Sequence, residues 1–476
     1  MVRNRIFTSA LVIIIGLLSV GTHLLSAQSK TEADRKIEYE KWDKLNLRYS
    51  TGMTSDTSKD FITVPKGYPG KRNFEVAKTP PTVEFAPVRG LLPEFFPEDN
   101  KGIWSEWGEV TRGPNGRYYM STGDHRALNS QVVIIEYDPV AKEQKIVVDV
   151  GKVCGWKQHH HTDGKIHGRM DILQDGTLVG ATWLGRNVKD DDVEHGWLGG
   201  YLLTHNVFTG RTENHGIPML NYSWHYHVTD TQTGVFMACG DGYAKGTAFL
   251  AYDVLKRKVL YAGIPPDNIK FNLRATLLDE RTGMLYSTDG NKEHTFFCYD
   301  QRTNRFRHLK CATPQIPGTG KNNQLRAYTE YRTPDNVFYC IDQVGNLFKF
   351  FPDEERTEYM DVCWDEGVYT TSMAISPKFR YLYYIPGSHG RTMNLETPIV
   401  QYDLETKTRK AIAFLQPFIH EKYGYVTTGT YGIELSPDGS YLVIHMNGGF
   451  GEDRHRSKFE HTSIFVVHIP ESERVE

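Results

Sequence analysis

From Trp107 to the end of the chain, the sequence repeats one unit seven times. Each unit opens with a short strand, a tight turn and a second strand, and the openings start at Trp107, His167, His225, Arg274, Arg326, Thr371 and Tyr431. Most turns carry Gly or Asn where a tight hairpin needs a residue that tolerates positive φ, in the triplets PNG, QDG, QTG, RTG, PDN and PDG. Because one unit of this size cannot bury its apolar face alone, the repeats have to stack against one another.

A second pair of strands follows each hairpin and contains a recurrent Tyr-Asp or a variant of it, as in EYD, AYD, CYD and QYD. Four strands per unit at a period of roughly 45 to 60 residues is typical of a β-propeller. The rival, a parallel α/β fold, requires helical periods between the strands, and the sequence after residue 60 has almost none. We therefore predict an all-β fold, a seven-bladed β-propeller with four-stranded antiparallel blades.

The last unit runs out of chain after its third strand, and a strand near Thr82–Val88 would supply the fourth. Pairing the two termini in this way closes the ring and leaves no sheet edge exposed. We therefore predict that the propeller spans residues 80–476 and that residues 28–79 form a short, partly helical N-terminal extension.

Residues 1–27 have the features of a secretory signal peptide: two arginines, an apolar run from Ala10 to Val20, and Leu25-Ser26-Ala27 as a small-residue cleavage site. We therefore predict a secreted or periplasmic protein. No later run approaches the roughly 20 apolar residues of a membrane span, and a net charge of −3 argues against a nucleic-acid partner. The six Cys lack CxxC spacing, and a core of this size does not require disulfides, although export permits them.

The first strand of each propeller blade lines the central channel, so the first residues of the repeats are expected to point into one shared funnel. The funnel then gathers two His, two Arg, a Tyr and a Trp: His167, His225, Arg274, Arg326, Tyr431 and Trp107. Loops after the second strands open on the same face and add His125 and His389. Any propeller channel has a wet, polar mouth, but this many convergent titratable groups favour a ligand site.

Two arginines suit a carboxylate, because the guanidinium fork pairs with it through two hydrogen bonds. His and Tyr are groups that move protons. Together they fit β-elimination from a uronic acid, in which Arg or a metal neutralises the carboxylate, one group removes the C5 proton and another protonates the leaving oxygen at C4. A glycoside hydrolase needs two carboxylates flanking the bond. Asp241, Asp289 and Asp342 keep that alternative open.

Metal binding is a competing account of the histidines. His159, His160 and His161 lie in a loop that enters the second blade, and a loop can present two of them to one ion. A Zn²⁺ site using Cys239, Cys298 or Cys340 with a nearby His is a further alternative to simple packing of these cysteines. We expect no obligatory cofactor and leave open a divalent metal, Ca²⁺, Mn²⁺ or Zn²⁺.

In its seven repeats and its His, Arg and Tyr funnel, the chain from about residue 80 onward resembles the exported seven-bladed β-propeller polysaccharide lyases, which include ulvan lyases and rhamnose–glucuronate lyases. The resemblance implies cleavage of the bond to the C4 oxygen of glucuronate by β-elimination. It implies proton transfer by His167, His225 and Tyr431, carboxylate binding by Arg274 and Arg326, and an anionic polysaccharide or oligosaccharide as substrate.

Three other functions remain open at this stage. The same site would serve an oligosaccharide dehydratase that removes water from a terminal uronate. A glycoside hydrolase would act on the same linkage without forming a double bond, and a non-catalytic propeller would only bind a glycan. Aromatic residues make up 12% of the chain, which suits sugar binding, although most of them are expected to pack the sheets.

Overall fold

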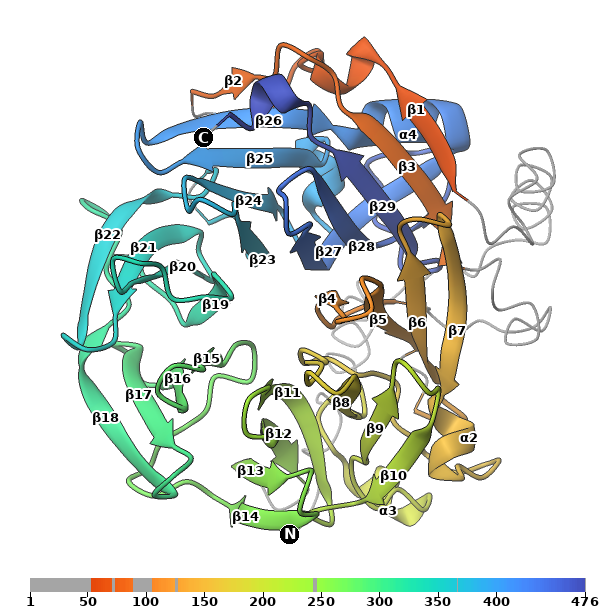
Figure 1. Ribbon diagram of the computed structural model, residues 1–476, viewed down its shortest axis with the longest axis vertical. Coiled ribbons are helices and arrows are strands. Elements are labelled where there is room, and N and C mark those ends of the chain that lie inside the picture. Colours follow the sequence, from red (N-terminus) through yellow and green to blue (C-terminus); the bar gives the residue numbers. More distant parts are fainter. Residues whose placement is uncertain are drawn as a thin grey trace, which may run out of the picture.

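The computed structural model describes residues 53–70, 73–88, 105–124, 127–242, 246–365 and 367–475. Seven sheets stand in a ring around a central axis, in sequence order, each with its innermost strand toward the axis (Figure 1). The predicted seven-bladed β-propeller is confirmed. The predicted signal peptide at residues 1–27 and the start of the extension lie outside the described residues.

Four blades have the four antiparallel strands that the repeats predict. Blade 1 consists of β4 (Thr111–Arg112), β5 (Tyr118–Gly123), β6 (Val132–Asp138) and β7 (Glu143–Asp149). Blade 3 consists of β11 (Tyr222–Asp230), β12 (Val235–Gly242), β13 (Thr247–Asp253) and β14 (Lys258–Gly263). Blade 4 consists of β15 (Leu277–Asp279), β16 (Met284–Thr288), β17 (Thr295–Asp300) and β18 (Arg305–Ala312). Blade 5 consists of β19 (Leu325–Tyr328), β20 (Phe338–Asp342), β21 (Asn346–Phe351) and β22 (Arg356–Val362).

The other three blades depart from this pattern. Blade 2 has β8 (Thr177–Ala181), β9 (Leu202–Asn206) and β10 (Thr212–Gly216), and its inner segment pairs through isolated bridges, from Lys165 to Trp183 and from Ile172 to Leu178. Blade 6 has β23 (Thr370–Ile375), β24 (Tyr381–Pro386), β25 (Pro398–Asp403) and β26 (Thr408–Phe414), with β2 (Glu75–Val76) added in parallel to β26. Blade 7 has β27 (Tyr425–Leu435), β28 (Tyr441–Phe450) and β29 (Ser463–His468).

The N-terminal segment closes the ring at blade 7. β3 (Thr82–Pro87) pairs with β29 as its fourth strand, as the sequence predicts, and β1 (Thr54–Thr57) adds a fifth at the outer edge. Glu473 fastens the same junction, because its Oε1 accepts the backbone N–H of Lys78 at 2.6 Å and of Thr79 at 3.0 Å, and Lys410 Nζ lies 2.9 Å from its Oε2. Contacts between the N-terminal segment and the C-terminal end of the chain therefore stabilise the closure of the ring.

The core lies between the blades. Among the described residues, buried apolar side chains form seven clusters, one between each pair of neighbouring blades. Strands rich in β-branched and aromatic residues, such as VVIIEYD in β6, supply both faces of each sheet. Hairpin turns are made by residues with positive φ, Gly176 at 86° in one blade and Asn336 at 63° in another.

Helices are few and short in the described parts of the chain: η1 (Lys59–Ile62), α2 (Val150–Cys154), α3 (Asp190–Glu194), η4 (Thr392–Leu395), α4 (Leu415–Tyr423) and η5 (Glu471–Glu473). Within the same ranges, none has the length and apolar character that crossing a bilayer requires. The six cysteines are all unpaired thiols, and five of them are buried.

Candidate functional site

Three of the predicted funnel residues occupy irregularities of the inner strands. The pairing register shifts between Trp224 and Tyr226, between Leu325 and Ala327, and between Thr430 and Gly432. The skipped residues are His225, Arg326 and Tyr431. An extra residue in one strand of a pair bends that strand and changes the direction of its side chain, and such bulges are frequent beside functional sites.

His167 and His225 lie together in the funnel and are almost fully enclosed. Their ring centroids are 4.6 Å apart at an interplanar angle of 83°, and the ring of Trp183 stacks on His225 at 3.9 Å. The side chains are 1% and 5% exposed, and none of their four ring nitrogens has a hydrogen-bond partner among the described residues. Polar atoms buried without a partner are costly, so they favour a site whose ligand would supply the missing hydrogen bonds.

Burial lowers the pKa of both imidazoles well below the ordinary value. The charges of Arg274, Lys165 and Arg326 lower the pKa of His225 further. Both rings are therefore neutral near pH 7, and each offers one nitrogen as a proton acceptor.

Arg326 is hydrogen-bonded within the protein and contacts the rings of two tyrosines. Its Nε donates to the Tyr369 hydroxyl at 2.6 Å, and its Nη1 donates to the carbonyl oxygen of Arg274 at 3.0 Å. The guanidinium carbon lies 5.0 Å from the ring centroid of Tyr431 and 5.3 Å from that of Tyr369. Since these contacts leave Nη2 without a protein acceptor among the described residues, one donor of the fork remains for a ligand.

The Tyr431 hydroxyl is buried and has no hydrogen-bond partner among the described residues. Burial raises its pKa well above the ordinary value, and Arg326 and Arg274 oppose that shift. The phenol therefore keeps its proton near neutral pH. Its ring lies 6.0 Å from the ring of His167, so a proton donor and a proton acceptor lie close together.

Two charged residues of the funnel, Lys165 and Glu106, were not predicted. Lys165 is 4% exposed, and its Nζ lies 3.8 Å from the ring centroid of Trp107 and 4.8 Å from that of Trp183. Glu106 is 1% exposed, and its Oε1 accepts the backbone N–H of Tyr431 at 2.8 Å. Burial lowers the pKa of Lys165 and raises that of Glu106.

Lys165 has a signal in the sequence, whereas strand alternation points the neighbour of Trp107 to the opposite face and so gives none for Glu106. Lys165 precedes His167 by two residues, and residues two apart in an extended segment share a face. Glu106 is the neighbour of Trp107, and its carboxyl group supports the strand that carries Tyr431.

The rim of the funnel is aromatic. The Trp107 ring lies 4.7 Å from Tyr431, 5.5 Å from His389 and 5.6 Å from Phe459, on which it stacks. His389 is exposed at this rim. Arg274 is half-buried, and its charge acts on both histidines. The structure thus brings together every predicted site residue except His125, which lies outside the described residues.

Of the three consecutive histidines His159, His160 and His161, the last makes its contacts away from the funnel that holds His167. His161 Nδ1 lies 2.8 Å from Asp192 Oδ1, and its ring stacks on His195 at 4.6 Å. Together with Asp191, these two histidines are the group of side chains among the described residues whose spacing would suit a metal ion. The predicted divalent metal has its best candidate ligands here.

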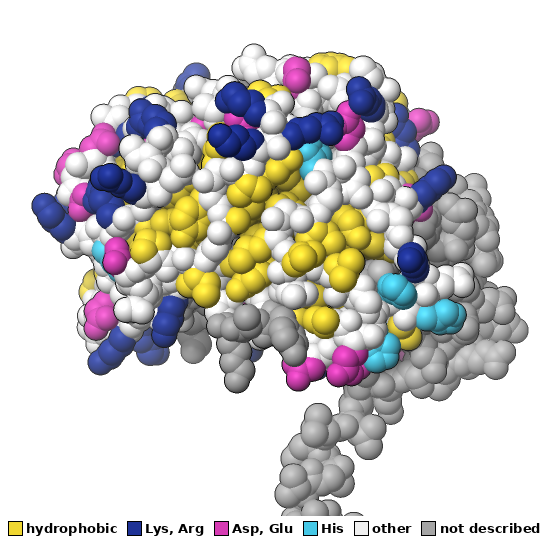
Figure 2. Space-filling model, turned by 90° about the horizontal axis from the view of Figure 1, so that it is seen from below, with side chains coloured by type: hydrophobic (Ala, Val, Ile, Leu, Met, Phe, Trp, Pro, Cys, Tyr) yellow, Lys and Arg dark blue, Asp and Glu magenta, His cyan; other side chains and the backbone are white. Residues whose placement is uncertain are grey.

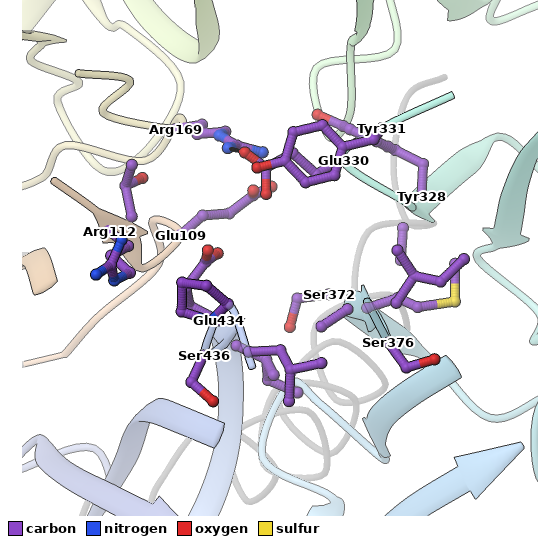
Figure 3. A pocket seen from close by; sticks show the side chains of 18 of the residues that line it. Glu109, Arg112, Arg169, Tyr328, Glu330, Tyr331, Ser372, Ser376, Glu434 and Ser436 are labelled. Atoms are coloured by element: carbon purple, nitrogen blue, oxygen red, sulfur yellow. Dashed lines mark hydrogen bonds and ion pairs between the residues drawn. The ribbon is translucent and has the colours of Figure 1, made fainter. Parts of the chain in front are cut away.

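A pocket lies among the inner strands at the centre of the ring (Figure 3). Its volume is about 430 Å³, and Glu109, Arg169, Tyr328 and Glu434 contribute to its lining. Arg169 and Tyr328 follow His167 and Arg326 by two residues, so they face the same channel one step further along. Because Arg169 pairs with Asp171 at 2.6 Å and with Glu330, much of its charge is neutralised inside the protein.

Comparison with known proteins gives no family. A scan against protein-family models found no match, and a search of curated proteins found no similar sequence. Among solved structures, "Structure of U3-55K" aligns with a TM-score of 0.45 and 9% identity, over 77% of this chain and 95% of that chain. At that level the alignment says nothing about function, and the propeller assignment rests on the seven sheets of the chain itself.

Proposed function

We propose that the protein is a carbon–oxygen lyase that cleaves uronate-containing saccharides by β-elimination in the funnel. The observation that carries this proposal is the meeting of two neutral imidazoles, a protonated phenol and an anchored guanidinium, with the histidine and tyrosine polar atoms buried and unpartnered. Elimination needs a base, an acid and a carboxylate clamp.

The proposed step uses these groups as follows. The carboxylate of the uronate binds Arg326 and Arg274, whose charge stabilises the negative charge that develops when the C5 proton leaves. A neutral ring nitrogen of His167 or His225 takes that proton, the electron pair forms the C4–C5 double bond, and the C4–O4 bond breaks. The Tyr431 hydroxyl gives its proton to the departing oxygen. Trp107 at the rim offers a flat surface for a neighbouring sugar ring.

The substrate class follows from the same groups. The arginines select an anionic sugar, so rhamnose–glucuronate polymers of the ulvan type and their oligomers are the first substrates to test. Export, which the leader at residues 1–27 favours, would place the protein where such polymers are met. A dehydratase would use the same base and clamp with water as the leaving group.

The test incubates the mature protein with anionic polysaccharides and their oligomers and follows ultraviolet absorbance and product mass. Elimination gives fragments whose summed mass equals that of the substrate and which absorb through the conjugated double bond. Dehydration gives the same chromophore with loss of one water, hydrolysis gives a gain of one water and no chromophore, and a non-catalytic propeller gives saturable binding without products.

Tyr431→Phe is the informative variant, because it removes one hydroxyl that makes no hydrogen bond within the described protein. We expect a rate loss of about 10²- to 10⁴-fold with the fold unchanged. Tyr425→Phe is the matched control in the same strand, since that hydroxyl donates to the His461 carbonyl at 2.6 Å, away from the funnel. Equal rates for Tyr431→Phe and the wild type would remove Tyr431 from the proposal.

A further inference from the structure

A group of three side chains on the outside of blade 2 is separate from the funnel. His161 comes from the loop that enters the blade, and Asp191 and His195 come from α3 and the residue after it. One ligand atom from each lies within 4.8 Å of the others. Toward the right of Figure 2, the side on which Figure 1 places α3, histidine side chains gather beside acidic ones.

His161 is oriented as a metal-ligating histidine is. Its Nδ1 lies 2.8 Å from Asp192 Oδ1, so Nδ1–H donates to that carboxylate and the lone pair of Nε2 is left for another partner. Nε2 lies 3.9 Å from Asp191 Oδ2. A carboxylate behind the imidazole fixes the ring and makes it a better donor of electrons to a metal.

The supporting carboxylate is itself fixed. Asp192 is fully buried, and its Oδ2 accepts Arg186 Nη1 at 2.8 Å and the backbone N–H of Lys189 at 2.8 Å. The carboxylate behind His161 is therefore held in place by hydrogen bonds of the protein itself.

The outer two residues are accessible. The side chains of Asp191 and His195 are 59% and 49% exposed, and the rings of His161 and His195 are nearly parallel at an interplanar angle of 13°. In a tetrahedral site with bonds of about 2.0 to 2.1 Å, ligand atoms stand about 3.3 Å apart. Because Asp191 and His195 are exposed, their side chains have room to rotate and to bring their ligand atoms closer to His161.

We propose that His161, Asp191 and His195 bind one Zn²⁺, with water in the remaining position. Two imidazoles and one carboxylate form a donor set that suits Zn²⁺, whereas Ca²⁺ and Mg²⁺ prefer oxygen ligands alone. The proposal stands independently of the lyase reaction.

The ion would fasten two segments that carry funnel residues. Lys165 and His167 follow His161 closely, and Trp183 precedes Arg186. Asp163 already ties the same two segments together, because it accepts the Trp197 indole N–H at 2.9 Å and the Thr182 hydroxyl at 2.5 Å. Bound zinc would thus join these two segments at the outer edge of the second blade and stabilise the folded protein.

The experiment uses the mature protein after removal of metals with a chelator. Calorimetric titration with ZnCl₂ gives the stoichiometry, and titration with CoCl₂ gives a visible spectrum that reports tetrahedral coordination. We expect one site per chain and a rise of the melting temperature with zinc. Asp191→Asn and His195→Ala should weaken binding at least about tenfold and abolish the rise. Because both side chains are exposed, neither change should prevent folding.

His159→Ala is the matched control, an exposed histidine of the same loop, and should bind zinc as the wild type does. His225→Ala serves as a second control in the funnel. The proposal is overturned if the stripped wild type binds no zinc, if His195→Ala binds it as tightly as the wild type, or if His225→Ala abolishes binding. Loss of elimination activity with zinc binding intact would concern only the proposed function.

Discussion

The buried histidines outside the funnel make a quantitative prediction about stability. His445 in β28 and His227 in β11 are fully buried, and neither has a hydrogen-bond partner for its ring nitrogens among the described residues. Burial lowers the pKa of each from 6.5 to about 3. Between these values the unfolded chain binds a proton that the folded protein excludes. The stability that these two neutral rings contribute is therefore fully present above pH 6.5, and it is lost as the pH falls toward 3.

The size of the effect follows from the difference in pKa. At about pH 5, roughly 1.5 units below the ordinary imidazole value, each histidine costs the folded state about 2 kcal/mol, since one unit corresponds to about 1.36 kcal/mol. His445→Gln removes one of these titrations and leaves a side chain of similar size. Buried carboxyl groups with raised pKa, such as Glu434, act in the opposite direction, but they act equally in both proteins and cancel in the comparison.

The assay is urea unfolding followed by tryptophan fluorescence, at about pH 7.5 and about pH 5. The free energy of unfolding of the variant, relative to the wild type, should rise by about 2 kcal/mol between the two conditions. His159→Gln, an exposed position, should show no such change. A difference between wild type and His445→Gln that stays constant within about 0.5 kcal/mol would show that burial does not keep this ring neutral.

Three further predictions concern the funnel and the ring closure. Arg326→Lys should lower kcat/KM for elimination by about 10²-fold, because a lysine keeps the charge and loses the fork, and circular dichroism should show an intact fold. The acidic limb of the pH–rate profile should lie below the ordinary imidazole range, because burial and nearby positive charge lower the pKa of His167 and His225; a limb near pH 6.5 contradicts this. Glu473→Ala should destabilise the protein by about 2 to 4 kcal/mol in thermal unfolding, because two backbone N–H groups and Lys410 lose their partner.

Much of the fold could be read from the repeats. The turn triplets and the strand pairs repeat seven times, which gives the number of blades. The last repeat is one strand short, which indicates that a strand from the N-terminal segment completes the last blade. The missing inner strand of blade 2 could not be predicted, since the segment around His167 has the same pattern as its equivalents and yet forms isolated bridges at Lys165 and Ile172 in place of a continuous ladder. The residue pattern of a segment gives its propensity to form a strand. Whether its hydrogen bonds to the next strand are regular depends on the segments that pack around it.

The candidate site was predictable for the residues that open each repeat. The bulges at His225, Arg326 and Tyr431 were not, because a register shift depends on how two strands pair and leaves little trace in one of them. The partners of His161 were missed for a related reason. Asp191 and His195 lie some 30 residues further along, and only folding brings them to the loop.

The most direct test of the account is the mass and absorbance of products from a rhamnose–glucuronate polysaccharide. If the funnel catalyses β-elimination, the fragments together have the mass of the substrate, carry a conjugated double bond and are absent when Tyr431→Phe replaces the wild type. Fragments heavier by one water and without ultraviolet absorbance, or saturable binding with no fragments across the anionic polysaccharides and oligomers tested, would contradict it.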